Sequence, residues 1–260
     1  MNNEVVILCG GKGSRLAEET SIRPKPMVEI GGKPILWHIM KIYSDYGIKK
    51  FILALGYKSE YIKEYFYNAR ISQSDFTLKM EPDAEPIFYN KMMESDWEIS
   101  FIDTGEDTLK GGRLKKLEKY IKGDDFFVTY GDGVADVNIE ELYKFHKAHG
   151  KIASVTAVHP PSRFGEMDLN GTDVQSFEEK PQMASGYING GYFVFKKELL
   201  NYLVDDEKCD LEFGALQKIA EEKQMQAFIH NGFWQCMDNV RERDYLNELV
   251  HKNKAPWIKS

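Results

Sequence analysis

The chain has 260 residues, of which 42% are hydrophobic and 13% aromatic, and its formal net charge is −7. This composition predicts a folded protein with a sizeable core rather than a disordered chain. The negative balance and the lack of a basic run argue against a dedicated nucleic-acid binder, whereas a small anionic substrate needs only a few local cations.

The cysteines and apolar runs indicate the compartment. Cys9, Cys209 and Cys236 form no CxxC pair, so we expect free thiols in a reducing environment. The apolar run at residues 5–8 is far too short for a signal peptide, and no run in the sequence approaches the length of a membrane span. We therefore expect a soluble, cytoplasmic protein without a membrane partner.

Strands and helices alternate along the first half of the chain. The unbroken apolar run at residues 5–8 predicts a strand buried on both faces, as in a parallel sheet. A helix follows, with Pro34 in its first turn and Gly47 just past its end. Further strands are predicted at residues 51–55, 99–102, 126–130 and 152–158, and further helices at 59–68 with Ser59 as cap, at 114–121, and at 139–149 with Asn138 as cap.

This alternation predicts an α/β fold with a doubly wound, mostly parallel mixed sheet, in which ligands bind beyond the carboxyl ends of the strands. The second half of the chain is expected to extend the sheet. No linker rich in proline, glycine and serine separates the halves, so we predict one domain over residues 1–260. The second half has predicted strands at residues 163–169, 174–178 and 187–195, and predicted helices at 196–203, 211–222 and 241–251.

A glycine-rich loop, GGKGSR at residues 10–15, follows the first strand. Such a loop can curl tightly and present bare backbone N–H groups to an anion. It is neither a Walker A motif nor a full GxGxxG pattern, and alone it is more simply interpreted as a plain turn. Phosphate binding is favoured by a basic set close behind the loop, in which Pro24 and Pro26 stiffen the backbone around a lysine. The basic residues are Lys12, Arg15, Arg23 and Lys25.

A second turn, Gly131-Asp132-Gly133, follows the predicted strand at residues 126–130. An aspartate between two glycines is an ordinary turn residue about as often as a functional one. Here it lies at the same edge of the sheet as the glycine-rich loop, where a carboxylate is well placed for a metal-bound nucleotide. Two independent signals therefore point to one crevice.

Taken in order, the motifs resemble those of the sugar nucleotidyltransferases, also called nucleotide-sugar pyrophosphorylases. The stretch "LCGGKGSRLAEETSIRPKPMVEIGGKPILWHIM" is similar to their signature, and "TYGDGVADVNI", "FEEKP", "INGGYFVF" and "FWQCMDNVRERDYL" follow. The resemblance runs from about residue 5 to 257 and leaves residues 70–98 poorly matched. It is closest to the glucose-1-phosphate cytidylyltransferase branch, because uridylyl- and thymidylyl-transferring relatives usually carry a proline where this chain has the alanine of "RLAEET".

The resemblance implies a Rossmann-like nucleotidyltransferase fold with a small sugar-binding β extension. Residues up to about 135 would form the nucleotide-binding half, and the rest the sugar-phosphate half. The implied reaction is transfer of a cytidylyl group from CTP to α-D-glucose 1-phosphate, with Mg²⁺ and without a covalent intermediate, giving CDP-glucose for surface polysaccharides. A homo-oligomer, hexameric in this branch, is also implied. UTP, dTTP or another sugar 1-phosphate, and a non-catalytic nucleotide-sugar sensor, stay open as alternatives.

The resemblance also implies the roles of individual residues. Catalysis would fall to Arg15, Lys25 and Asp132, and magnesium would bind Asp132 and Asp238. The nucleotide would contact Leu8, Gly10, Gly11, Lys12, Gly13, Ser14, Arg15, Lys25, Thr104, Arg113 and Asp132, with Thr104 and Arg113 helping to select cytosine. The sugar phosphate would contact Glu179, Lys180, Asn189 and Gly190.

Several of these residues have plainer interpretations outside the resemblance. Asp238 alone predicts only a helix cap, and Lys180 a solvated lysine. Ser14 stands where the family usually has threonine and keeps the hydroxyl group. Cys9 stands where the family usually has a small alanine, and we expect it to pack in the core.

Overall fold

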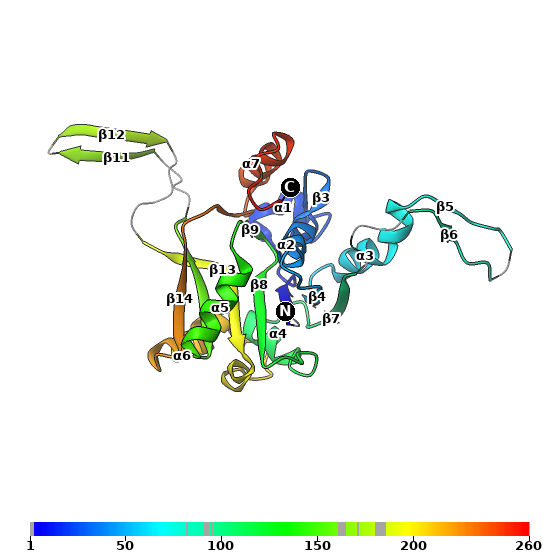
Figure 1. Cartoon of the computed structure of the whole chain (residues 1–260), viewed down its shortest axis with the longest axis horizontal. Coiled ribbons are helices and arrows are strands. Elements are labelled where there is room, and N and C mark those ends of the chain that lie inside the picture. Colours follow the sequence, from blue (N-terminus) through cyan, green and yellow to red (C-terminus); the bar gives the residue numbers. More distant parts are fainter. Residues whose placement is uncertain are drawn as a thin grey trace.

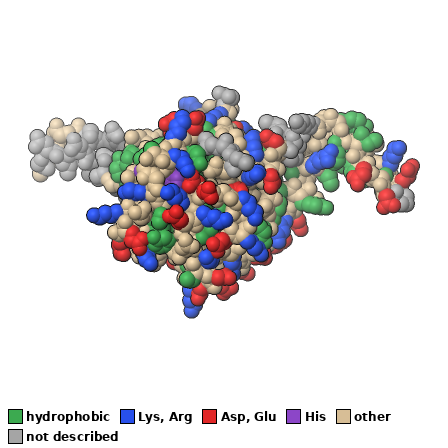
Figure 2. Space-filling model, turned by 60° about the horizontal axis from the view of Figure 1, so that its bottom comes forward, with side chains coloured by type: hydrophobic (Ala, Val, Ile, Leu, Met, Phe, Trp, Pro, Cys, Tyr) green, Lys and Arg blue, Asp and Glu red, His purple; other side chains and the backbone are tan. Residues whose placement is uncertain are grey.

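The body of the protein is a single sheet covered by helices, and two β-hairpins stand off its two ends (Figure 1). The computed structural model describes residues 3–81, 83–90, 94, 96–160, 165–170, 172–179 and 186–259, with the backbone alone for 165–170 and 176–179. The face in Figure 2 mixes basic and acidic side chains without a broad patch of either sign.

The central sheet has seven strands, β1 (Glu4–Leu8), β4 (Lys50–Leu55), β7 (Glu98–Asp103), β8 (Asp125–Tyr130), β10 (Ala153–Val158), β13 (Ile188–Lys196) and β14 (Met225–His230). Their order is β14-β10-β13-β8-β1-β4-β7. All neighbours are parallel except β13, which runs antiparallel to both β8 and β10. The predicted mostly parallel mixed sheet is confirmed, and strands from the second half extend it as expected.

The remaining elements connect and cover this sheet. The α-helices are α1 (Ala17–Thr20), α2 (Ile35–Ser44), α3 (Ser59–Gln73), α4 (Lys110–Lys116), α5 (Ile139–His149), α6 (Gln217–Glu221) and α7 (Val240–His251). The tighter or wider turns are η1 (Ser14–Leu16), η2 (Lys25–Met27), η3 (Lys197–Tyr202) and η4 (Leu211–Leu216). The two-stranded pairs are β2 (Glu29–Ile30) with β3 (Lys33–Pro34), β5 (Phe76–Thr77) with β6 (Ile87–Phe88), β9 (Gly133–Ala135) with β15 (Trp234–Cys236), and β11 (Gly165–Asn170) with β12 (Asp173–Glu179). No helix in the described ranges is long and apolar enough to cross a bilayer.

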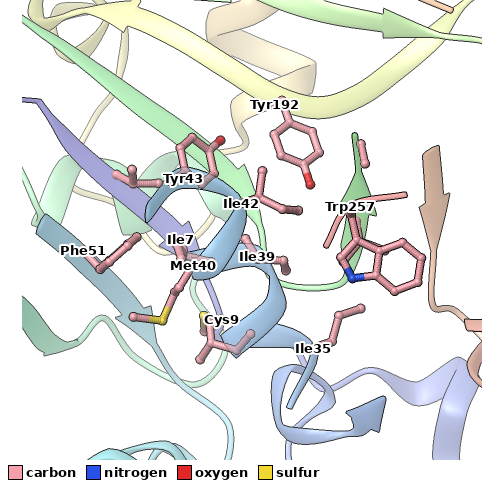
Figure 3. Packing of buried hydrophobic residues seen from close by; sticks show 14 of the residues in the cluster. Ile7, Cys9, Ile35, Ile39, Met40, Ile42, Tyr43, Phe51, Tyr192 and Trp257 are labelled. Carbon is pink, nitrogen blue, oxygen red and sulfur yellow. The ribbon is translucent and has the colours of Figure 1, made fainter. Parts of the chain in front are cut away.

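Strand β1 is buried on both faces, as its unbroken apolar run predicted. Val5 and Ile7 belong to one hydrophobic cluster, and Val6 and Leu8 to a second cluster on the other face. Figure 3 shows the first cluster, where helix α2 packs on the sheet beside Cys9. The thiol of Cys9 is 1% exposed, which confirms its expected packing role, and burial raises its pKa.

The structure corrects several predicted elements. Helix α3 begins after Lys58, whose φ is 50°, and its N-terminus has no side-chain cap, so the predicted Ser59 cap is wrong. The helix predicted at residues 114–121 is α4, which starts earlier, at Lys110, and ends earlier, at Lys116. Its glycine pair lets the backbone pack against the carbonyl oxygens of residues 206 and 209. The helix predicted at 196–203 is the 3₁₀ turn η3. Asn138 caps α5 as predicted.

A buried histidine ties α2 to the C-terminal segment. The Nε2 atom of His38 lies 2.8 Å from the carbonyl oxygen of Ile30, and Trp257 donates its Nε1–H to His38 Nδ1 at 3.3 Å. Both contacts suit a neutral ring with its proton on Nε2. Burial, reinforced by the charge of Lys33 and opposed by the bond to Ile30, lowers the pKa of His38 to about 4.

Acid should therefore weaken the fold through His38. Its pKa is about 6.5 in the unfolded chain and about 4 in the folded one, so the unfolded chain binds more protons between these values. Stability is full above about pH 6.5 and falls as the pH drops toward 4. Between about pH 7 and pH 5, urea titrations should show the wild type losing ~2 kcal/mol more unfolding free energy than His38→Gln. The control is His251→Gln, at the exposed end of α7, whose unfolding free energy should change with pH as that of the wild type does. If the unfolding free energy of His38→Gln also changed with pH as in the wild type, the prediction would be wrong.

Candidate active site

A pocket of about 360 Å³ opens at the carboxyl ends of β1 and β8, which are neighbouring parallel strands. Every residue predicted to bind nucleotide lines it except Lys12 and Thr104. Seven further lining residues were not among the predicted site residues, although Gly131 belongs to the predicted turn and Tyr130 directly precedes it. The seven are Cys9, Pro26, Thr108, Leu109, Lys110, Tyr130 and Gly131.

Two larger hollows lie elsewhere on the protein. One of about 640 Å³ lies between residues 19–32 and helix α7, and one of about 630 Å³ lies beside α3 and β7. Neither is lined by Arg15, Lys25 or Asp132. The smaller pocket is therefore the one that combines a glycine-rich loop, cations and the carboxylate of Asp132.

The glycine-rich loop is shaped by steric limits at Gly13. Its φ of 62° lies in the left-handed region, which glycine adopts without strain. A Cβ at this position would also lie 2.9 Å from Thr20 Cγ2 and 3.0 Å from Lys25 Cβ. The loop can thus pass directly over Lys25 only because residue 13 has no side chain.

Arg113 supports the loop from below. Its side chain rises from α4, the residue is 4% exposed, and all five of its described hydrogen bonds go to protein acceptors. Thr104, which is 1% exposed, is one of these acceptors. The structure therefore shows both residues as supports of the pocket wall, and their predicted role in selecting cytosine stays a prediction. The acceptors are the carbonyl oxygens of Gly10, Leu55, Gly105 and Glu106, and Oγ1 of Thr104, at 2.7–3.1 Å.

Four predicted residues that are far apart in the sequence form one cluster of two cations and two carboxylates. Lys25 Nζ lies 2.6 Å from Asp132 Oδ2 and 2.6 Å from Asp238 Oδ1. Arg15 Nη1 lies 2.9 Å from the other oxygen of Asp238. The Lys25 side chain is only 9% exposed. Lys25 begins the turn η2 with Pro24 before it and Pro26 after it, so its backbone is held as the sequence predicted.

The charges in this cluster stabilise one another. Burial alone would lower the pKa of Lys25, but the carboxylates of Asp132 and Asp238 outweigh burial and raise it. For Asp238, burial acts to raise the pKa, but Lys25 and Arg15 outweigh it and lower the pKa. Lys25 and Asp238 are therefore charged at neutral pH.

Asp238 is not a helix cap. The neighbouring Asn239 caps α7 by accepting a hydrogen bond from the backbone N–H of Glu242. The backbone N–H of Asp238 in turn donates to Glu242 Oε2 at 2.5 Å, and Cys236 Sγ lies 3.6 Å from Asp238 Oδ2. The Asp238 carboxylate contacts Lys25 and Arg15, which line the pocket. The possible metal-ligand atoms of Cys236, Asp238 and Glu242 all lie within 4.8 Å of one another. Sequence reasoning missed Cys236 and Glu242.

The carboxylates suit a divalent metal ion. Oxygens of Asp132 and Asp238 converge on one cationic atom, so they lie no farther apart than twice the 2.6 Å contact distance. Carboxylate oxygens are the ligands that Mg²⁺ prefers, and Mg²⁺ usually takes one or two of them together with water and substrate phosphates. The donor set therefore fits such an ion.

The predicted sugar-phosphate residues divide into two groups. Asn189 donates to the hydroxyl of Tyr130 at 2.9 Å, and Tyr130 lines the pocket, so Asn189 borders it. Next to it, the carbonyl oxygen of Gly190 accepts from Trp234 Nε1 at 2.7 Å. Glu179 ends β12 in a hairpin that stands away from the body (Figure 1), so the structure does not bring it to the pocket. Lys180 lies outside the described residues.

Lys12 also points away from the pocket. Its Nζ lies 2.8 Å from Asp107 Oδ1 and 3.5 Å from Glu106 Oε1, at the exposed outer side of the loop. These ion pairs tie the loop to residues 105–107, where the carbonyl oxygens of Gly105 and Glu106 accept hydrogen bonds from Arg113. A nucleotide contact by Lys12 stays a prediction.

The fold and this site define the class of protein. The sequence profile of the nucleotidyl transferase family matches residues 4–238, and the chain belongs to this family. It is 48% identical, over 98% of both sequences, to glucose-1-phosphate cytidylyltransferase of Salmonella typhimurium. It is 38% identical, again over 98% of both sequences, to the probable glucose-1-phosphate cytidylyltransferase of Bacillus subtilis.

Solved structures share the fold. HddC from Yersinia pseudotuberculosis, complexed with GMP-PN, has a TM-score of 0.67 and 24% identity, and the match covers 95% of this chain and 99% of that one. A UDP-glucose pyrophosphorylase complexed with UDP-glucose has a TM-score of 0.69 and 14% identity, with 97% and 100% covered. Together with the observed sheet, these likenesses confirm the predicted Rossmann-like nucleotidyltransferase fold.

Adding one methyl group at Gly10 should destabilise the protein. A Cβ there would lie 2.0 Å from Arg113 Nη1, so Gly10→Ala must push the guanidinium off its buried acceptors. We expect a loss of about 2 kcal/mol or more in unfolding free energy, measured by urea denaturation. Gly11→Ala is the matched control, because a Cβ there meets nothing within 4 Å, and it should stay within about 0.5 kcal/mol of the wild type. Equal stability of the two variants would refute this role of Arg113.

Proposed function

We propose that the chain transfers a cytidylyl group from CTP to α-D-glucose 1-phosphate and releases CDP-glucose and pyrophosphate. The observation that carries this proposal is the identity of 48% and 38%, over nearly full length, to the two cytidylyltransferases of Salmonella typhimurium and Bacillus subtilis. The pocket supports it, because a glycine-rich loop and two cations suit a triphosphate.

The sugar phosphate itself is the nucleophile. Its second pKa is near 6, so it is mostly dianionic near neutral pH and needs no protein base. One of its oxygens attacks the α-phosphorus of CTP, and the bond to pyrophosphate breaks on the opposite side. The barrier arises from bringing two polyanions together, so the protein contributes mainly position and positive charge.

The residues of the pocket divide this work. Backbone N–H groups of the loop, together with Ser14, hold the triphosphate. Arg15 and Lys25 neutralise the charge that moves onto the departing pyrophosphate. Lys25 suits this role because its backbone is held between two prolines while its side chain reaches into the pocket.

Enzymes of this family generally use a divalent metal ion, and Mg²⁺ is the ion we propose here. Asp132 and Asp238 would hold it, since their oxygens already converge on one cation. The bound ion supplies positive charge to the phosphates. Asp132 lines the pocket with Lys25 and Arg15, and Asp238 contacts both of these cations, so an ion held there would add its charge beside theirs.

The second half of the chain receives the sugar phosphate. Asn189, which donates a hydrogen bond to the pocket residue Tyr130, supports this role, and Gly190, Glu179 and Lys180 complete the set by resemblance. The chain works as one domain, a view supported by the single sheet that strands from both halves share. Arg113 and Thr104 shape the wall on which the base rests.

The chain also works as a cytoplasmic homo-oligomer, hexameric by its resemblance to the cytidylyl branch. The β5–β6 hairpin supports this, because it stands off the body and carries exposed apolar side chains (Figures 1 and 2). Met80 within the hairpin is 90% exposed, and Tyr67 in the preceding helix α3 is 88% exposed. Exposed apolar surface of this kind marks protein–protein contacts.

The proposal predicts a substrate preference. Pyrophosphate release measured with CTP, UTP, dTTP, ATP and GTP, each with glucose 1-phosphate or mannose 1-phosphate, should be fastest with CTP and glucose 1-phosphate. A preference for UTP or dTTP would overturn the assigned base but not the class of reaction. Magnesium-independent CTP binding without turnover of any pair would instead favour a nucleotide-sugar sensor.

Loss of either charge at the reacting phosphates should slow turnover. Lys25→Ala and Asp132→Asn should each reduce kcat by at least about a hundredfold, the scale of losing one preorganised electrostatic contact. The measurement is pyrophosphate release at saturating CTP, glucose 1-phosphate and Mg²⁺. Lys144→Ala on the exposed face of α5 is the control and should keep the wild-type rate. Near-normal rates in either of the first two variants would refute the mechanism.

A further inference from the structure

The ammonium group of Lys25 occupies the place where a metal ion would bridge Asp132 and Asp238. Its Nζ atom lies 2.6 Å from an oxygen of each carboxylate. Magnesium binds carboxylate oxygens at about 2.0–2.1 Å, so an ion shared by the same two oxygens would lie almost where Nζ lies. The ammonium and the ion therefore cannot hold these positions together.

We propose that Lys25 is an internal counterion of the metal site, which an incoming divalent ion displaces toward the bound phosphates. The inference rests on the proposed function, because that function assigns the metal to Asp132 and Asp238. It goes further by giving Lys25 two successive positions, one without the metal and one with it.

Burial explains why the site needs such a counterion. The side chains of Lys25 and Asp238 are 9% and 15% exposed, and that of Asp132 is 33% exposed. Two partly buried carboxylates without a partner would repel each other and lose hydration, which destabilises the folded protein. With Lys25 between them and Arg15 on the outer oxygen of Asp238, the cluster has equal numbers of positive and negative charges.

The path of the displaced group is short. Pro24 and Pro26 hold the backbone of Lys25, so the displacement falls to its flexible side chain. Lys25 already lines the 360 Å³ pocket together with the glycine-rich loop and Arg15. A rotation of the side chain therefore moves its ammonium group from the carboxylates to the phosphate side of the same pocket.

This exchange couples metal binding to nucleotide binding. A divalent ion that enters alone must expel a cation into an otherwise cationic pocket beside Arg15, which opposes its binding. When a triphosphate is present, its negative charges receive the displaced ammonium group. The site should therefore bind free metal weakly and bind metal with nucleotide well.

Metal binding without nucleotide tests the exchange directly. Mn²⁺ alone, titrated into the full chain and followed by electron paramagnetic resonance, should bind Lys25→Met at least about tenfold more tightly than the wild type, since the competing charge is gone. Lys12→Met removes the same charge from the same loop but does not contact either carboxylate, so its Mn²⁺ affinity should equal that of the wild type. Adding Asp238→Asn to Lys25→Met should abolish the gain. Equal or weaker binding by Lys25→Met would overturn the proposal.

A second measurement on the wild type guards against misfolding of Lys25→Met. Reductive methylation with formaldehyde and cyanoborohydride, quantified by peptide mass spectrometry, should label Lys25 several times more when saturating Mn²⁺ frees its ammonium group, while labelling of Lys144 stays constant. Unchanged labelling of Lys25 would overturn the exchange.

The two proposals fail separately. If the wild type turns over CTP but Lys25→Met gains no Mn²⁺ affinity, the exchange is wrong and the proposed function stands. If the affinity gain is found but no nucleotide and sugar phosphate pair is turned over, the exchange stands and the proposed function is wrong.

Discussion

The pocket depends on one buried guanidinium group. Arg113 reaches from α4 beneath the glycine-rich loop and donates hydrogen bonds to three backbone carbonyl oxygens at strand ends. They belong to Gly10 after β1, Leu55 at the end of β4 and Gly105 after β7. The backbone approaches it so closely that a Cβ at Gly10 or Gly56 would collide with it. Parallel strands leave unpaired carbonyl groups at their carboxyl ends, and here a single charged side chain satisfies several of them at once. The glycine-rich loop thus rests on a buried side chain that five hydrogen bonds hold in place.

Charge balance organises the other side of the pocket. Lys25 and Arg15 meet the carboxylates of Asp132 and Asp238, which come from the end of β8 and from the segment between β15 and α7. The cluster connects the first quarter of the chain to its last. Because the partners are held by short ion pairs in a partly buried place, binding of a ligand must rearrange existing contacts. The same groups that stabilise the site without ligand are therefore those to which we assign the phosphates and the metal.

Much of the fold and part of the site could be predicted from local patterns. The apolar run of β1, the glycine-rich loop, the proline-flanked Lys25 and the Asn138 cap each follow from residues within one short segment, and the structure confirms these features. Predictions failed where a neighbour in space decides. The helix predicted from residue 114 begins at Lys110, where the glycine pair before Arg113 allows α4 to pack against the backbone at residues 206–210. Strand β14, at the edge of the sheet, was not predicted because its short segment becomes a strand by pairing with β10.

The sequence by itself determined the class of fold, the glycine-rich loop and the identity of the charged residues, because these depend on spacing and side-chain chemistry along the chain. Only the tertiary structure decided which charges meet. Asp238 looked like a helix cap in isolation, yet Asn239 takes that position and leaves the Asp238 carboxylate to Lys25. Arg113 was expected to read the base, yet the described contacts of its guanidinium are all with the protein. Ion pairs and buried hydrogen bonds join residues more than a hundred positions apart, and no local pattern carries that information.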